Sequence, residues 1–181
     1  MFMIKQESKQ KYFVILGIVI ITALFAFSQL SDATAAKKDG KKFDDWTVAC
    51  TAKNDETKTP EICILTQQVN LTKDDKQQTI ALFQIGYFGE KKELKIIQTL
   101  PLGVRLEAGT SIISSKKLIA PGRYQTCTQD GCQAVAAISK ADLKTLTSTK
   151  ENSVAFMNLN GQQITLPLST KGLSKGLNYI K

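Results

Sequence analysis

The sequence predicts an all-β fold, a sandwich or barrel-like single domain of short antiparallel strands, from three observations. Short segments in which apolar and polar residues alternate follow one another along most of the chain. Turn residues separate these segments at spacings of about 8–12 residues, which is typical of sandwiches and barrels. An Asn160-Gly161 pair, the strongest short hairpin signal, stands between two of them. We therefore expect one β-rich domain over residues 43–181.

The first half of this domain contains only strand signals. The alternation and the apolar runs predict strands over residues 46–50, 63–69, 79–85, 94–100, 104–108 and 111–114. Polar, Gly and Pro residues predict turns over residues 72–76, 86–93 and 121–122. The pattern puts Cys63, Leu65 and Val69 on one face of their strand, because side chains alternate between the faces of a sheet.

The second half adds two hairpins and the only helix signals. One hairpin joins residues 123–127 to 132–138, and the other joins residues 153–159 to 162–168. One short helix is predicted near residues 139–147, where Ser139 suits the N-cap and Asp142 the first turn. A second short helix fits residues 171–180, although its two glycines lower helix propensity.

The N-terminus has the pattern of an export signal. Three lysines precede an apolar run, residues 12–27, interrupted only by Thr22, and Ala33-Thr34-Ala35 matches a small-x-small cleavage site. We expect residues 1–35 to be a cleaved signal peptide, followed by a flexible Lys-rich leader over residues 36–42. The alternative is an uncleaved membrane anchor, because the apolar run approaches the length that spans a bilayer.

Four cysteines lie beyond the signal, and an even number in an exported chain predicts disulfides. Four cysteines can form two disulfides in three arrangements, and we favour the arrangement in which both disulfides are local. Cys127 and Cys132 flank the turn residues Asp130-Gly131, so they would face each other across a hairpin. Cys50 and Cys63 flank a polar loop. A zinc site is disfavoured, because the gap between Cys50 and Cys63 is too long for a zinc knuckle.

The sequence carries no recognisable catalytic set. The chain contains no His, which removes His-dependent nucleophiles and His-ligated metals, and it has no phosphate-binding or dinucleotide-binding glycine motif. We therefore expect a protein that is not an enzyme, with no catalytic, cofactor or metal residues. A hydrolase that uses paired carboxylates is the remote alternative. The acidic residues fall mostly in turn-like segments, where solvation explains them better.

The chain is basic, with a formal net charge of +8, and removal of residues 1–35 leaves 21 basic and 14 acidic residues. The lysine clusters are not interleaved with aromatic residues, so nucleic acid is not an expected partner. The positive charge is best explained as a soluble basic surface, and the alternative is attraction to anionic lipid, lipopolysaccharide or host glycans. Contact with a membrane is expected only through the signal segment or by peripheral association.

The mature chain resembles the invasion-associated locus B family of exported bacterial proteins. The similar segments, in chain order, are Asp45-Trp46-Thr47-Val48-Ala49-Cys50, Cys63-Ile64-Leu65-Thr66-Gln67, residues 100–106 leading to Gly109, and Cys127 followed by Gly131-Cys132. The C-terminal stretch departs from the family's Ser-Leu-x-Gly-Phe-x-x-Ala pattern at Thr170, Leu173 and Gly176.

The resemblance implies a β-rich protein that is periplasmic or associated with the outer membrane, and it offers no catalytic residues. It implies structural roles for Trp46 as a core aromatic residue, for Gly103 and Gly109 as turn positions, and for the cysteines as crosslinks. We expect a non-catalytic envelope protein that binds another envelope protein or a host-surface component. The alternative is a surface-exposed or secreted factor that promotes attachment to, or entry into, host cells.

Overall fold

The computed structural model describes residues 39–53, 56–58 and 61–181. The predicted signal peptide and the start of the leader lie outside the described residues. The elements are β1 (Lys42–Phe43), β2 (Trp46–Thr51), β3 (Ile62–Lys73), β4 (Lys76–Phe88), β5 (Glu93–Leu100), η1 (Leu106–Ala108), β6 (Thr110–Ser114), β7 (Lys117–Thr128), β8 (Gly131–Ala137), α2 (Lys140–Ser148), β9 (Asn152–Met157), β10 (Gln163–Pro167) and α3 (Leu173–Tyr179).

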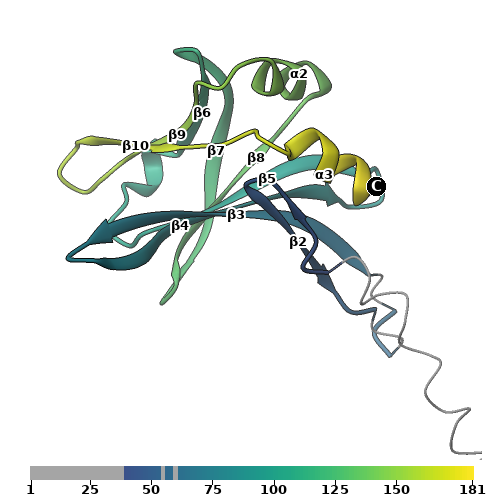
Figure 1. Ribbon diagram of the computed structural model, residues 1–181. Helices are drawn as coiled ribbons and strands as arrows, with labels where there is room; N and C mark the ends of the chain where they lie inside the picture. Colours follow the sequence, from purple (N-terminus) through teal and green to yellow (C-terminus); the bar gives the residue numbers. More distant parts are fainter. Residues whose placement is uncertain (1–38, 54–55, 59–60) are drawn as a thin grey trace, which may run out of the picture. The chain divides into compact units, whose positions relative to one another are not determined.

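All ten strands pair antiparallel in the order β1-β2-β3-β4-β5-β8-β7-β6-β9-β10, which confirms the all-β prediction. The long strand β7 joins two parts of this sheet. Its first half, up to Gly122, pairs with β6, and its second half, from Arg123, pairs with β8. Register shifts occur in both halves, and such bulges bend and twist a strand. Figure 1 shows β6, β9 and β10 above the part formed by β2 to β5.

The core lies between these two parts of the sheet. Its largest fully buried side chains include Trp46, Phe83, Leu65 and Ile112, which come from strands of both parts. The predicted face of β3 is confirmed, since Leu65, Gln67 and Val69 are buried and Cys63 is half-buried. The alternation in the sequence therefore identified the inward faces of these strands correctly.

Both predicted helices are present. Ser139 Oγ accepts a hydrogen bond from Asp142 N–H at 3.1 Å, and Asp142 Oδ2 accepts one from Ser139 N–H at 2.9 Å, which together form a capping box at the start of α2. Helix α3 packs against β1, β2 and β3. One departure from the family pattern has a local reason: Gly176 replaces Ala, and a Cβ there would lie only 2.7 Å from Leu65 Cδ1.

Gly172, at the N-terminus of α3, gives a testable prediction. Its φ of +82° lies in the left-handed region, and a Cβ there would collide with the backbone oxygen of Phe43. We expect Gly172→Ala to lower the free energy of unfolding by about 2 kcal/mol. Gly89→Ala is the matched control: its φ is +71° but nothing lies within 4 Å, so only the backbone cost of about 1 kcal/mol remains. Equal losses in urea unfolding of the two variants would show that α3 does not depend on this close approach.

Three expectations about the first half are wrong in detail, namely those over residues 86–93, 104–108 and 121–122. Of residues 104–108, only Val104 makes a strand-like bridge, to Asn158, and η1 replaces the predicted strand. Glycines with positive φ on both sides of this segment, Gly103 and Gly109, turn the chain there and confirm their predicted role. The turn expected over 86–93 is shorter, because β4 continues to Phe88.

Pro121-Gly122 does not form a turn but lies within β7. The pairing with β8 begins only at Arg123, so Pro121 has a strand partner on one side, Ser111 of β6. A proline is tolerated at such a position because the missing N–H has no partner to bond. The turn lies instead at Ser115 and Lys116, both with positive φ, as a tight hairpin turn requires.

The described part of the leader is paired with the sheet rather than free. Gly40 N–H donates to Val48 O at 2.9 Å, and Val48 N–H donates to Lys41 O at 2.8 Å. Cys50 N–H donates to Asp39 Oδ1 at 2.9 Å. Residues 39–43 therefore cover the outer edge of β2, which would otherwise expose unpaired backbone groups.

Candidate functional site: exposed leucines on paired loops

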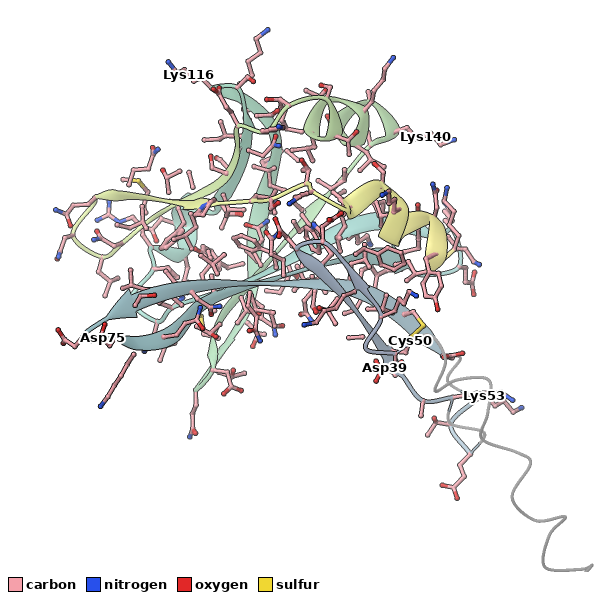
Figure 2. The ribbon with its side chains drawn as sticks, in the orientation of Figure 1. Asp39, Cys50, Lys53, Asp75, Lys116 and Lys140 are labelled. Atoms are coloured by element: carbon pink, nitrogen blue, oxygen red, sulfur yellow. A yellow bond between two sulfur atoms is a disulfide. The ribbon has the colours of Figure 1, made fainter. Side chains whose placement is uncertain are left out.

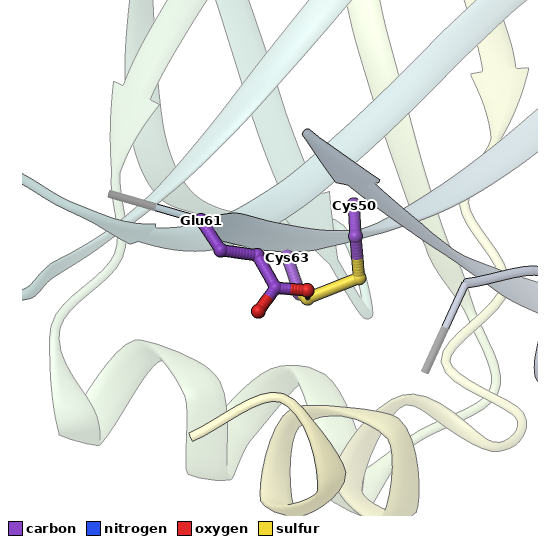
Figure 3. Close-up of side chains that lie close together, drawn as sticks. All are labelled: Cys50, Glu61 and Cys63. Atoms are coloured by element: carbon purple, nitrogen blue, oxygen red, sulfur yellow. Dashed lines mark hydrogen bonds between the residues drawn. A yellow bond between two sulfur atoms is a disulfide. The ribbon is translucent and has the colours of Figure 1, made fainter. Parts of the chain in front are cut away.

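The four cysteines form the two local disulfides that the sequence favours, Cys50–Cys63 and Cys127–Cys132. Each joins directly paired residues of neighbouring strands, β2 with β3 and β7 with β8. Glu61 lies beside the first disulfide, with Oε1 3.8 Å from Cys63 Sγ (Figure 3). Cys50, Glu61 and Cys63 are the one group of potential metal ligands among the described residues. Since both sulfurs are bonded to each other, they offer no thiolate, and the cluster is not a metal site in this form.

Some buried polar side-chain atoms have no hydrogen-bond partner among the described residues. They include the amide atoms of Gln98, which is fully buried, and the hydroxyls of Thr110 and Tyr124. Burial raises the pKa of Tyr124 to about 12, because a phenolate is poorly solvated there. Its hydroxyl is therefore protonated at neutral pH. These side chains supply hydrogen-bonding groups, and none of them is a general base at neutral pH.

A groove of about 380 Å³ lies on the outer face of β6, β9 and β10. Ile113, Thr165 and Pro167 contribute to its walls, and Lys116 and Glu151 also line it. Glu151 is the one carboxylate among the lining residues, so the groove does not offer the pair that glycoside-type hydrolysis requires. The acidic pair Asp74-Asp75 forms a turn, since both residues have positive φ between β3 and β4.

The most distinctive exposed feature is a set of three leucines on two adjacent loops. Val104 bridges to Asn158, while Leu159 N–H donates to Gly103 O at 2.9 Å and Arg105 N–H donates to Met157 O at 2.9 Å. These bonds hold the segment after β5 against the loop between β9 and β10. Three exposed leucines lie on these paired loops and are called here the leucine patch: Leu102, Leu106 and Leu159.

The side chains of the leucine patch are 59%, 52% and 66% exposed, in chain order, and unlike the equally exposed Leu71 and Leu118 they lie on loops that are paired with each other. Two further interactions lie within its loops. Arg105 Nε lies 3.3 Å from Glu107 Oε1, and Asn158 closes the β9–β10 loop by accepting Gln162 N–H at 2.9 Å through its Oδ1. The hairpin predicted at Asn160-Gly161 is thus confirmed, with a five-residue loop that displays Leu159. Preformed loops with exposed apolar side chains are typical of protein-binding surfaces.

Sequence reasoning missed the leucine patch. The alternation over residues 104–108 indicated a strand, in which Leu106 would be buried, and nothing near Leu159 marked it as exposed. The combination of a Pro-Leu-Gly turn with a Leu-Asn-Gly turn was the available signal, but the pairing of these turns is a tertiary contact.

The fold and this site define a small antiparallel β domain with two disulfides and an exposed apolar loop patch. A family model described as invasion associated locus B (IalB) protein matches residues 46–181, and the chain belongs to this family. The crystal structure of invasion associated protein B from Bartonella henselae has a similar fold, with a TM-score of 0.62 and 15% sequence identity over 77% of this chain and 92% of that one. No curated protein matches the chain.

The family description names no reaction. Within the part of the chain that the structure describes, no helix has both the length and the apolar character needed to cross a bilayer.

Proposed function

We propose that this protein is an exported, non-catalytic component of the bacterial envelope, in the periplasm or at the outer membrane, and that it binds another envelope protein through the leucine patch. The exposure of the three leucines carries the proposal. The signal-like N-terminus and the two disulfides support export, because disulfides persist in oxidising compartments. The single carboxylate in the groove and the bonded cysteines support a binding role over a catalytic one.

Crosslinking in living cells tests the leucine patch. We expect the native protein to form one or a few specific adducts, and the variant Leu102→Gln/Leu106→Gln/Leu159→Gln to lose them. Replacing exposed leucines should change the free energy of unfolding by only about 0.5 kcal/mol each. Leu71→Gln is the matched control, because Leu71 is also 52% exposed but belongs to β3. Adducts that persist in the triple variant would refute the leucine patch as the binding surface.

A second candidate is a surface-exposed or released factor that promotes attachment to host cells. The basic composition favours it, and so does the family's association with invasion. Protease treatment of intact cells separates the two candidates. Protected material of mature mass supports a periplasmic binding role, whereas digestion of the protein on intact cells supports contact with host surfaces.

A further inference from the structure

The β6–β7 turn and the segment after α2 come together although they are distant in the sequence. Ser115 N–H donates to Glu151 O at 2.9 Å, and the Ser115 and Thr149 hydroxyl oxygens lie 3.1 Å apart. Lys116 and Lys117 follow Ser115 directly, and Lys150 lies between the two residues that Ser115 contacts. The contact therefore gathers these three lysines at one place.

Helix α2 extends this basic surface. Lys140 and Lys144 are one helical turn apart and exposed, while Leu146 is buried and Leu143 half-buried. Figure 2 shows Lys116 and Lys140 pointing outward at the same end of the domain. The basic end is defined here by its five exposed lysines: Lys116, Lys117, Lys140, Lys144 and Lys150.

The positive charge of the basic end is not neutralised within the described residues. None of its ammonium groups has an ion pair there, whereas Lys95 pairs with Glu93 and Arg105 with Glu107. The same elements contribute two acidic side chains. Asp142 accepts the Ser139 N–H in the capping box, and Glu151 lines the groove beside Lys116. A surface with five lysines and two carboxylates has a clear positive excess.

An exposed apolar side chain adjoins this surface at Lys116. Leu118 of β7 is 61% exposed and pairs with Ile113 of β6, and Ile113 lines the groove together with Lys116. A soluble polyanion has no apolar region to receive a leucine. The interface of a lipid bilayer has both anionic headgroups and acyl chains, and peripheral proteins bind it by combining basic charge with buried apolar area.

We infer that the basic end docks on an anionic lipid bilayer, with its lysines at the phosphate level and Leu118 in the interface. The leucine patch lies on other loops, so this inference is independent of the partner proposed above. Lipid attachment would keep the protein at a membrane face while the leucine patch remains accessible to a protein.

Vesicle co-sedimentation tests the inference, with the protein recovered from the cell envelope. Vesicles contain phosphatidylcholine with or without phosphatidylglycerol. We expect binding only to the anionic vesicles, and weakening by salt. Each lysine near an anionic surface contributes about fivefold in affinity, so Lys116→Gln/Lys117→Gln/Lys150→Gln should weaken binding by about a hundredfold. Leu118→Ser should weaken it by about tenfold.

The matched control is Lys91→Gln/Lys92→Gln/Lys175→Gln, which removes the same charge from exposed lysines of other elements. Fluorescence of Trp46, the single tryptophan, checks that every variant is folded. Equal losses in both triple variants, or no loss in either, would overturn the inference. So would an unchanged affinity of Leu118→Ser combined with lysine-dependent retention on heparin, which would assign the basic end to a soluble polyanion.

Discussion

Replacing Trp46 by alanine is expected to lower the free energy of unfolding by about 3–5 kcal/mol, the range for truncating a buried large aromatic side chain. Trp46 is fully buried at the start of β2, and its Nε1–H donates to Ser169 O at 3.0 Å. The variant therefore loses core packing and also a bond between the first described strands and the C-terminal segment. Urea unfolding followed by circular dichroism measures the change.

Ser169 connects the C-terminal segment to the first strands through several hydrogen bonds. Gln67 of β3 accepts Ser169 N–H at 3.0 Å and donates to Ser169 O at 3.3 Å, as a paired strand would. Asp45 Oδ2 accepts the Ser169 hydroxyl at 2.6 Å. We call these bonds, together with that of Trp46, the Ser169 latch.

Two milder variants separate the ring of Trp46 from its hydrogen bond. Trp46→Phe keeps most of the ring and removes the donor, so it should cost less than Trp46→Ala. Gln67→Leu leaves Ser169 N–H without its partner and should cost about 1–3 kcal/mol, with Trp46 fluorescence as the reporter. If Gln67→Leu were as stable as the native protein, the latch would be a consequence of the fold and not a support for it.

Removing the Cys50–Cys63 disulfide is expected to lower the free energy of unfolding by about 3 kcal/mol, and removing Cys127–Cys132 by about 2 kcal/mol. The first closes a loop with a sequence separation of 13 residues and the second one of 5, and the longer loop restricts the unfolded chain more. Paired Cys→Ala variants avoid placing a hydroxyl at buried Cys132. Thermal and urea unfolding of both variants give the two losses.

Reducing agent provides the control for the disulfide variants. It should destabilise the native protein and each single-disulfide variant, but leave a variant with all four cysteines replaced unchanged. A larger loss from removing Cys127–Cys132 would contradict the loop argument, and would show that local strand pairing dominates.

Local signals in the sequence predicted local structure well. The capping box at Ser139 involves residues three apart, and the disulfide across Asp130-Gly131 joins neighbours in one hairpin, so adjacent residues encode both. The prediction failed at Pro121, because whether a strand has a neighbour on both sides depends on distant residues. It failed over residues 104–108 because alternation does not distinguish a strand from a loop packed on another loop.

The sequence by itself determined the all-β class, the inward faces of the strands, both helices and the cysteine pairs, since these depend on residue periodicity and on contacts within single hairpins. Only the tertiary structure decided the strand order, the Ser169 latch, the leucine patch and the basic end. Each of these joins segments separated by tens of residues, and their contacts form between backbone groups or polar side chains whose residue types are common everywhere in the chain. Such contacts produce no periodic pattern in the sequence. They form only because the packing of the whole sheet brings the distant segments together.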